Sequence, residues 1–390
     1  QTLSGANTYT GSTQIGTDGT LSLGDGGASG SIASASAITN NGALIFNRSN
    51  VMDVGNVISG TGTVNQIGTG TTTLTATNTY TGATKVTSGT LALSGAGSIA
   101  GSSSLAVGAD TNFSIAGTTN GATVNSLSGL GNVALGESTL TLNAGEDTFG
   151  GVISGNGALT LANGKQTLSG ANTYIGTTSI VGKSTLLVEG SIDSKTVQTV
   201  EGGTLGGSGT LSGAVSIGSE GSGTLLGVAG KTLTMGELTL GKGAVVDAVL
   251  GTTSDSSLFQ VNGALTLGGT LNVAAGSEFG VGVFKLADYS GTLTNNGLTV
   301  GKAPEGTDLY VQTSVANRVN VVNTTGQTLQ FWDGDSVGGA NRNNNVVDGG
   351  NGTWTANSDN WTTADGFINA PMKPQPGYAI FQAAGGKVDV

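Results

Sequence analysis

The sequence predicts an all-β fold, a right-handed parallel β-helix (solenoid) with about 20–25 residues per coil. The main observation is a phrase that occurs three times: TLSGANTYTG at Thr2–Gly11, TLTATNTYTG at Thr73–Gly82 and TLSGANTYIG at Thr167–Gly176. A short unit that recurs along a chain is typical of solenoids, in which each coil is covered by its neighbours.

The spacing of the phrase sets the expected coil length. Leu3, Leu74 and Leu168 hold the same place in the three copies and are 71 and 94 residues apart. Three coils of about 23.7 residues and four of about 23.5 would account for these separations. A second phrase, GNVISGTGTV at Gly55–Val64, returns as GGVISGNGAL at Gly150–Leu159, and its shift of 95 residues again predicts four coils.

The composition favours strands and turns over helices. Glycine contributes 71 of the 390 residues, and each glycine inside a helix costs about 1 kcal/mol relative to alanine. Between the glycines lie short alternating strands in which a threonine separates two leucines, as at Leu140/Leu142 and Leu159/Leu161. Because successive side chains of a strand point to opposite faces, the aliphatic residues should fill a narrow interior, and threonine, serine and asparagine should cover the outside.

The charge and the missing residue types exclude several functions. Lys and Arg number 13 against 24 Asp and Glu, a net charge of −11, so a phosphate backbone would be repelled and no nucleic-acid partner is expected. The chain has no cysteine and no histidine, which excludes disulfides, thiolate metal sites and the Ser-His-Asp and Cys-His catalytic arrangements. No run of about 18 apolar residues occurs, so we expect no membrane insertion by this chain. The sequence opens and ends in mid-pattern, which indicates an internal piece of a longer protein.

Paired carboxylates on a β-helix face are the remaining route to catalysis, because they can cleave a polysaccharide. The acidic residues available for this are Glu137, Glu146, Asp147, Asp193, Glu201, Asp247 and Asp255. They are scattered through glycine-rich turns and form no cluster, so we interpret them as solvated turn residues. The sequence therefore predicts that the chain is not an enzyme and has no catalytic or cofactor-binding residue.

One acidic group has the residue types of a calcium site. Asp333, Asp335 and Asp348 lie on a glycine-rich loop with asparagines between them, and oxygen ligands suit Ca²⁺. The loop lacks the bidentate Glu that closes the best-known calcium loop, so we favour a loop solvated by its own Asp and Asn side chains. These three aspartates are the only metal candidates, and calcium is the only candidate cofactor.

The asparagine of each Asn-Thr-Tyr triplet is a candidate structural residue. Asn7, Asn78 and Asn172 should occupy equivalent corners of the solenoid, several coils apart. Asparagine hydrogen-bonds backbone groups well at turns, and we expect that role here.

Changes in composition divide the chain into three parts. Residues 1–200 carry the Asn-Thr-Tyr phrases, and residues 201–326 continue the β-helix with glycine and leucine but without the phrase. Residues 327–390 contain all three tryptophans and are rich in Asp and Asn. We interpret the tryptophans as covering a core, and the alternating tail YAIFQAAGGKVDV predicts that a further β-helical stretch begins in this last part.

The repeated phrases also carry a family resemblance. Together with LGGSGTLSGAVSIGSEGSG at Leu205–Gly223, they resemble the passenger-associated transport repeats of AIDA-like autotransporters, the type V secreted proteins of Gram-negative bacteria. Segment Phe331–Trp361 resembles a module of very large adhesins of that family. The resemblance implies an extracellular passenger at the bacterial cell surface, anchored through a C-terminal outer-membrane β-barrel translocator that this chain does not contain.

Two functions of different classes stay open. The resemblance and the missing catalytic groups favour an internal passenger fragment of an adhesin, which binds host cell-surface or extracellular-matrix glycoproteins or self-associates. The alternative is a passive β-helical stalk that aids secretion and presents a distal functional head. A polysaccharide-cleaving β-helix is the least favoured function.

Overall fold

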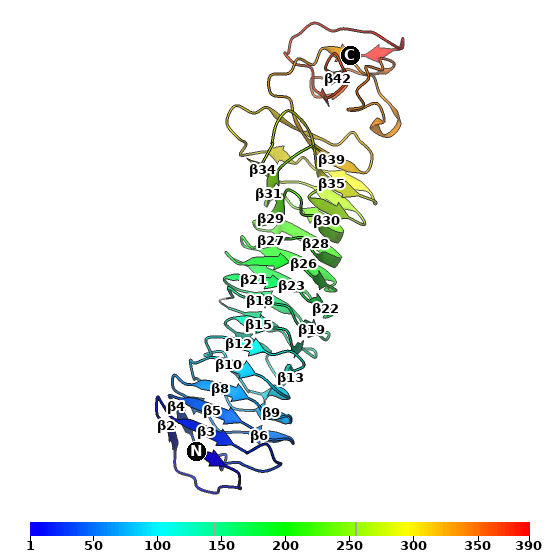
Figure 1. Ribbon diagram of the computed structural model, residues 1–390. Helices are drawn as coiled ribbons and strands as arrows, with labels where there is room; N and C mark the ends of the chain where they lie inside the picture. The colour runs from blue at the N-terminus through cyan, green and yellow to red at the C-terminus, as the bar shows by residue number, and fades with distance from the viewer. Residues whose placement is uncertain (144, 254–255) are drawn as a thin grey trace. The chain divides into compact units, whose positions relative to one another are not determined.

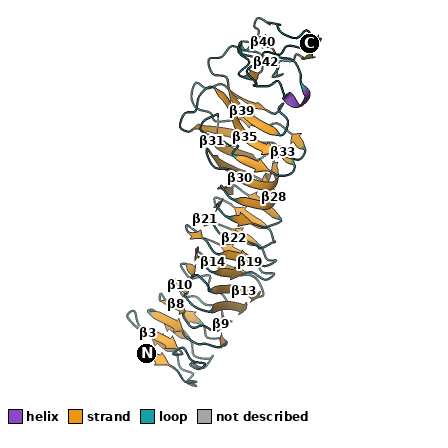
Figure 2. Cartoon of the chain, turned by 45° about the vertical axis from the view of Figure 1, so that its right-hand side comes forward, coloured by secondary structure: helices purple, strands orange, loops and turns teal. Residues whose placement is uncertain are grey.

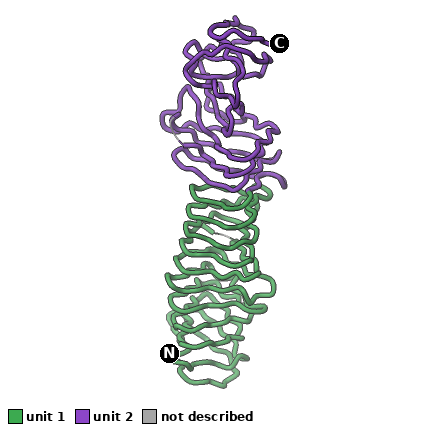
Figure 3. The backbone as a smooth tube through the Cα atoms, turned by 90° about the vertical axis from the view of Figure 1, so that its right-hand side faces the viewer, with its two compact units in different colours: residues 1–214 green, residues 215–390 purple. Residues whose placement is uncertain are grey.

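The computed structural model describes residues 1–143, 145–253 and 256–390 and consists almost entirely of strands and turns (Figure 1). In this described part the only helical element is a single 3-10 turn, η1 (Val337–Gly339), and no helix has the length and apolar character needed to cross a membrane. Contacts divide the chain into two compact units, residues 1–214 and 215–390 (Figure 3), with the division inside strand β28 (Thr210–Glu220). The division into three parts at residues 200 and 326 stays a prediction.

The first unit is a right-handed parallel β-helix, as predicted. Its first sheet contains, from one coil to the next, β1 (Thr2–Leu3), β3 (Thr20–Leu23), β5 (Ala43–Phe46), β8 (Thr63–Gln66), β10 (Thr84–Val86), β12 (Leu105–Val107), β15 (Leu127–Gly129), β18 (Thr148–Phe149), β21 (Lys165–Leu168), β24 (Thr185–Val188) and β27 (Thr204–Gly207). Its second sheet contains β6 (Met52–Val54), β9 (Thr71–Leu74), β11 (Thr90–Gly95), β13 (Asn112–Thr118), β16 (Asn132–Ala134) and β19 (Val152–Ser154). Its third sheet includes β14 (Ala122–Val124), β17 (Leu140–Leu142), β20 (Leu159–Leu161), β23 (Thr178–Val181) and β26 (Thr196–Val200). Strands β2 (Thr13–Ile15), β4 (Ile38–Asn40) and β7 (Ile58–Ser59) form a separate three-stranded sheet, and β22 (Ala171–Asn172) pairs with β25 (Ser191–Ile192).

The strand register measures the coil length directly. Along the first sheet the paired positions are Leu3, Leu23, Phe46, Gln66, Val86, Val107, Gly129, Phe149, Leu168, Val188 and Gly207. Successive positions differ by 19 to 23 residues in these pairings, and most differ by 19 to 21. The coil is therefore shorter than the 23.5 residues that the phrase spacing predicted.

Period-two alternation fills the interior, as predicted. Leu44, Val64, Thr84, Leu105 and Leu127 are stacked at one register position of the first sheet, and each is 0% exposed. Burying an aliphatic side chain of this size stabilises a fold by roughly 1.5–3 kcal/mol, so each coil contributes several such increments. The one hydroxyl in this column belongs to Thr84, two residues after the second copy of the repeated phrase.

A column of glycines forms one corner of the first unit. Its members are Gly131, Gly151, Gly170, Gly190 and Gly209. A Cβ atom at Gly170 would lie 2.0 Å from the carbonyl oxygen of Gly151, and one at Gly190 would lie 2.2 Å from that of Gly170. These glycines are required by close backbone approach between coils, since no side chain fits in that space.

The second unit begins with the same parallel arrangement and then ends it. One sheet contains β29 (Gly223–Val228), β31 (Ala244–Leu250), β34 (Thr270–Ala275) and β37 (Thr299–Val300). A second contains β30 (Leu233–Leu240), β32 (Phe259–Val261), β35 (Gly282–Tyr289), β39 (Arg318–Asn323) and β38 (Leu309–Gln312), with β33 (Leu265–Leu267) and β36 (Leu293–Asn295) beside it. The coils lengthen here, because Val246 pairs with Leu271 and Leu271 with Val300, steps of 25 and 29 residues. Strand β39 pairs antiparallel with both β35 and β38, which ends the parallel ladder of this sheet.

Residues 327–390 form a small module against this antiparallel end (Figure 2). It contains an antiparallel sheet of β40 (Phe331–Trp332), β42 (Trp361–Thr362) and β43 (Asn369–Ala370), and a parallel pair of β41 (Gly352–Thr353) and β44 (Val388–Asp389). Trp332 and Trp361 are 1% and 0% exposed, with ring centroids 5.2 Å apart, and they share a core with Val322 of β39. Two of the three tryptophans therefore lie in a core.

The glycine column gives a stability prediction. Replacing Gly170 by Ala forces the preceding coil to move at Gly151. Overpacking of this kind costs about 1–3 kcal/mol. Guanidinium denaturation followed by far-UV circular dichroism should show a lower midpoint for Gly170→Ala than for the unchanged chain. Gly11→Ala is the matched control, because a Cβ at Gly11 has no atom within 4 Å. Equal midpoints for the two variants would contradict the close-packing argument.

Candidate functional site

The asparagines of the repeated phrase tie neighbouring coils together through backbone groups. The Nδ2 of Asn172 donates to the carbonyl oxygens of Gly170 and Ser191, each at 3.1 Å, and its Oδ1 accepts the backbone N–H of Ile153 at 3.0 Å. Ser191 lies in the next coil and Ile153 in the preceding one. A single side chain thus satisfies backbone groups in three successive coils.

Asn78 makes the same set of contacts. Its Nδ2 donates to Ala76 and Ser98, and its Oδ1 accepts from the backbone N–H of Ile58 at 2.9 Å. Asn172 is 0% exposed and Asn78 is 4% exposed. Asn7 donates to the carbonyls of Gly5 and Ser31, but among the described residues its Oδ1 accepts no hydrogen bond.

The tyrosine of the phrase belongs to a short hydroxyl chain. The Tyr80 hydroxyl lies 2.6 Å from Thr84 Oγ1, which lies 2.9 Å from Ser102 Oγ, and that hydroxyl donates to the carbonyl oxygen of Gly82. Thr84 is the polar member of the aliphatic column described above. Thr84 therefore gives the buried phenol a hydrogen-bond partner, which the aliphatic residues of this column could not provide.

The other two copies repeat this contact. Tyr174 lies 2.6 Å from Thr178 Oγ1, and Tyr9 lies 2.9 Å from Thr13 Oγ1. Tyr80 and Tyr174 are 0% exposed, whereas Tyr9 is 41% exposed. Burial raises the pKa of Tyr80 and of Tyr174 far above the usual value of a phenol, although the threonine hydrogen bonds act in the opposite direction.

The two repeated phrases are halves of one structural unit. The isoleucine of each Val-Ile-Ser-Gly phrase gives its backbone N–H to the asparagine of an Asn-Thr-Tyr phrase one coil later, Ile58 to Asn78 and Ile153 to Asn172. The separations are 20 and 19 residues, one coil in each case. This relation could have been read from the sequence, and sequence reasoning missed it.

The three phrases do not share one face of the solenoid, which corrects the prediction of equivalent corners. Leu3 and Leu168 lie in the first sheet, whereas Leu74 lies in the second. The separations of 71 and 94 residues are therefore not whole numbers of coils. The physical reason is that the phrase needs only a strand followed by a corner, and every coil offers more than one of these.

The loop that was weighed as a calcium site, with Asp333, Asp335 and Asp348, holds a positive charge of its own. Asp333 Oδ1 accepts the backbone N–H of Asp348, and its Oδ2 accepts Asn369 Nδ2 at 2.8 Å. Arg342 Nη1 donates to the carbonyl oxygen of Asp333 at 2.8 Å and to Asn341 Oδ1 at 2.8 Å. Oxygen atoms of the loop that the sequence suggested as the site of a metal cation therefore accept hydrogen bonds from the guanidinium.

The other two aspartates of this loop also accept protein donors. Asp335 accepts Asn360 Nδ2 at 2.6 Å and lies 3.6 Å from Arg342 Nη2, and Asp348 accepts Asn344 Nδ2 at 2.8 Å. Burial is the largest influence on Asp333 and raises the pKa of that carboxyl. In the part of the chain that the structure describes, no three acidic side chains gather as a metal site. Calcium binding stays the less favoured alternative, and it would require displacing these donors.

Several of the scattered carboxylates bind a hydroxyl or amide one coil away. Ser126 donates to Asp147, Ser212 to Asp193 at 2.9 Å, and Asn156 to Glu137 at 2.6 Å. Asp247 accepts Asn272 Nδ2 at 2.8 Å. Asp255 lies outside the described residues. These contacts connect neighbouring coils and assign the four carboxylates a structural role.

Removing the Asn172 side chain should destabilise the first unit. Asn172→Ala leaves the buried backbone N–H of Ile153 without its acceptor and removes one donor each from the carbonyl oxygens of Gly170 and Ser191. An unpaired buried group costs about 1–3 kcal/mol. The urea midpoint should fall clearly for Asn172→Ala and less for Asn7→Ala, since Asn7 makes fewer bonds and is less buried. A larger loss for Asn7→Ala would contradict this role of the asparagine.

The buried phenols predict a loss of stability at alkaline pH. The unfolded chain releases its tyrosine protons near pH 10, whereas folded Tyr80 and Tyr174 keep theirs, so the free energy of unfolding falls as pH rises above about 10. Replacing both by Phe should reduce that fall by about 1.4 kcal/mol per pH unit for each phenol removed. Urea denaturation at a series of alkaline pH values measures the slope, with Tyr378→Phe as control because Tyr378 is 84% exposed. An unchanged slope in the double variant would show that other groups cause the alkaline loss.

Comparison with known proteins identifies the repeats and finds a relative of the chain. The passenger-associated-transport-repeat family matches residues 1–23, 64–93 and 152–182, which contain the three Asn-Thr-Tyr corners. The Adhesin BmaC autotransporter of Brucella suis biovar 1 (strain 1330) is 35% identical over 307 residues, which cover 70% of this chain and 8% of that relative. No solved structure matches the chain. The repeats and the relative place the chain at the cell surface or outside the cell. The chain is therefore a segment of an autotransporter passenger that carries passenger-associated transport repeats.

Proposed function

We propose that this passenger segment is part of an adhesin and attaches the bacterium to host cells or extracellular matrix, or to other bacteria by self-association. The observation that carries the proposal is the 35% identity over 307 residues with a protein named as an adhesin autotransporter. The chain spans about 8% of the length of that relative, so adhesion by this segment is a property to be tested here.

The exterior of the first unit suits many weak, uncharged contacts. Thr123, Thr141, Thr160, Ser179 and Gln198 form one outward column along the third sheet, one residue per coil. Neighbouring strands of a sheet are about 4.8 Å apart, so the column presents hydrogen-bonding groups at a regular spacing. A glycoprotein or a second copy of the chain can bind such a surface through several hydrogen bonds at once.

A shallow groove adjoins this column. It has a volume of about 420 Å³, and its lining includes Thr123, Thr139, Thr141, Ser98 and Asn120. Of the side chains in the described part of the chain, no charged one lines the groove. The groove therefore favours an uncharged polar partner over an ionic one, which supports glycans or polar peptide segments as ligands.

The alternative is a passive stalk that presents a distal head and is anchored through a separate outer-membrane barrel. The near-constant coil length of the first unit favours it, because regular stacking supports a spacer without any specific surface. In either function the segment is non-catalytic. The scattered carboxylates, most of them bound to hydroxyl or amide groups one coil away, support that part of the proposal.

Adhesion can be tested with beads that carry the chain. Beads should bind epithelial cells or matrix-coated surfaces at least several-fold better than beads carrying an unrelated β-helix of similar size. Thr141→Glu combined with Thr160→Glu should reduce this binding, because charge is placed on the uncharged column. Thr73→Glu is the matched control, since Thr73 faces outward on the second sheet.

Three outcomes separate the proposals. Binding no better than that of the unrelated β-helix contradicts adhesion by this segment and supports the stalk. Binding lost in the double variant and kept in the control supports adhesion through the column. Binding kept in both variants supports adhesion and contradicts the role of the column.

A further inference from the structure

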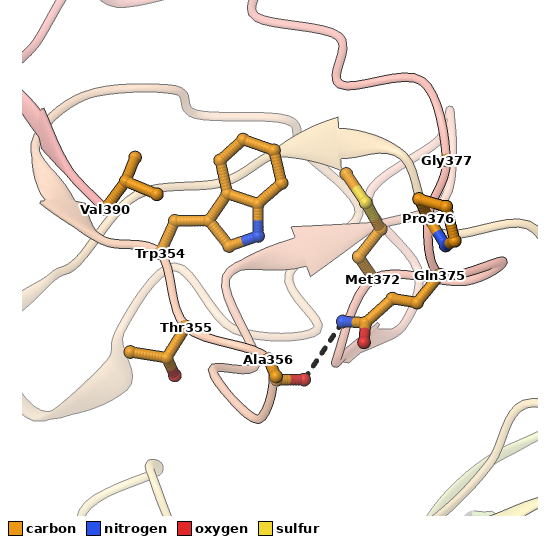
Figure 4. A pocket seen from close by; sticks show the side chains of 8 residues that line it. All are labelled: Trp354, Thr355, Ala356, Met372, Gln375, Pro376, Gly377 and Val390. Atoms are coloured by element: carbon orange, nitrogen blue, oxygen red, sulfur yellow. Dashed lines mark hydrogen bonds between the residues drawn. The ribbon is translucent and has the colours of Figure 1, made fainter.

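A pocket of about 520 Å³ lies in the module of residues 327–390 (Figure 4). Its lining includes the side chains of Trp354, Met372, Pro376 and Val390, the last residue of the sequence, together with Thr355 and Gln375. The volume lies within the range of small-molecule sites, roughly 300–1,000 Å³. Neither the repeats nor the solenoid coils contribute to it.

Trp354 packs against a buried aromatic ring beside this pocket. Its ring centroid is 4.8 Å from that of Trp361 at an interplanar angle of 67°, and Trp361 is 0% exposed. Trp354 is itself only partly buried and also packs against the module core. Figure 4 shows its indole nitrogen on the side of the ring that faces Met372 and Gln375. The ring therefore presents an apolar surface that packs against the module core.

Polar groups without protein partners lie around this ring. Gln375 Nε2 donates to the carbonyl oxygen of Ala356 at 3.0 Å, which fixes the amide and leaves Oε1 as a free acceptor. Within residues 1–143, 145–253 and 256–390, no hydrogen bond occupies Trp354 Nε1 or Thr355 Oγ1 either. The pocket thus offers a donor, an acceptor and a hydroxyl beside an aromatic face.

Among the residues that the structure describes, no Asp, Glu, Lys or Arg side chain lines this pocket. A charged ligand would lose its hydration here without gaining a counter-charge, so the ligand should be neutral. A pyranose ring has an apolar C–H face that can stack on an indole and hydroxyls that bond to polar groups at the ring edge. We propose that this pocket binds a neutral pyranose residue of a glycan. The proposal rests on the adhesive function above and names its ligand class.

Saturation-transfer NMR on the whole chain tests the proposal. The probes are the methyl glycosides of galactose, glucose, mannose and N-acetylglucosamine, with N-acetylneuraminic acid as an anionic comparison and a Leu-Pro dipeptide as an apolar one. At least one neutral glycoside should bind with a Kd on the order of 1 mM, and its ring C–H protons should receive the strongest transfer. No binding by any neutral glycoside, or stronger binding by either comparison compound, overturns the proposal.

Three variants connect the binding to the pocket. Trp354→Ala should weaken binding at least tenfold. Gln375→Ala should weaken it several-fold and keeps the test valid if loss of Trp354 disturbs the core, because Gln375 is exposed. Tyr378→Ala should leave binding unchanged, since Tyr378 is 84% exposed and does not line the pocket. Equal affinity in all three variants places the sugar elsewhere and overturns the proposal.

Competition separates this proposal from the adhesive function. Excess of the bound glycoside should reduce bead attachment to cells in the assay above. If beads attach and no glycoside binds the chain, the sugar pocket is wrong and adhesion stands. If a glycoside binds through Trp354 and beads fail to attach, the sugar pocket stands and adhesion by this segment is wrong.

Discussion

Backbone hydrogen bonding from each coil to the next is the constraint on which the first unit depends. A coil of about 20 residues has few interior side chains, so its corners must bring backbones close enough to bond. The glycine column from Gly131 to Gly209 makes that approach sterically feasible. At the corners that interrupt regular strand pairing, Asn78 and Asn172 supply the missing donors and acceptors. Without them, the buried backbone N–H groups of Ile58 and Ile153 would lose their acceptors.

This constraint explains what the sequence could and could not predict about the coils. Alternating leucines, frequent glycine and a recurring phrase were sufficient to predict a parallel β-helix. Each of these features reflects something that stacked strands need locally. Coil length was overestimated because Leu3 and Leu74 were taken to occupy the same sheet. A corner motif can recur at any of the corners of a coil. The separation between two copies can therefore include a fraction of a coil in addition to whole coils. The separation between Ile153 and Asn172, which bond directly, is the better measure.

The module of residues 327–390 was harder to predict, because its contacts are not periodic. Gln312 of β38 donates to the carbonyl oxygen of Asn369 across 57 residues, and Asn343 Nδ2 donates to Gln312 Oε1. No local pattern predicts such pairs. The Asp-rich loop illustrates the difficulty, since its residue types suit calcium while Arg342, which stands among the same asparagines, provides the cation. Tyr310 lies in the same surroundings, and burial raises its pKa to about 12, with Asp359 acting in the same direction.

The two units present different surfaces for binding. In the first unit the outward column of Thr141, Thr160 and their neighbours is built by repetition, so each position offers nearly the same weak contact as the next. Repetition of this kind supports avidity, because many equivalent contacts add together, but it discriminates poorly between partners. The pocket at Trp354 is different, since an aromatic ring packed against the module core lies beside polar groups that have no hydrogen-bond partner among the described residues. Specific recognition of a ligand should therefore depend on irregular modules such as this one, where the backbone does not follow the regular repeat of the coils.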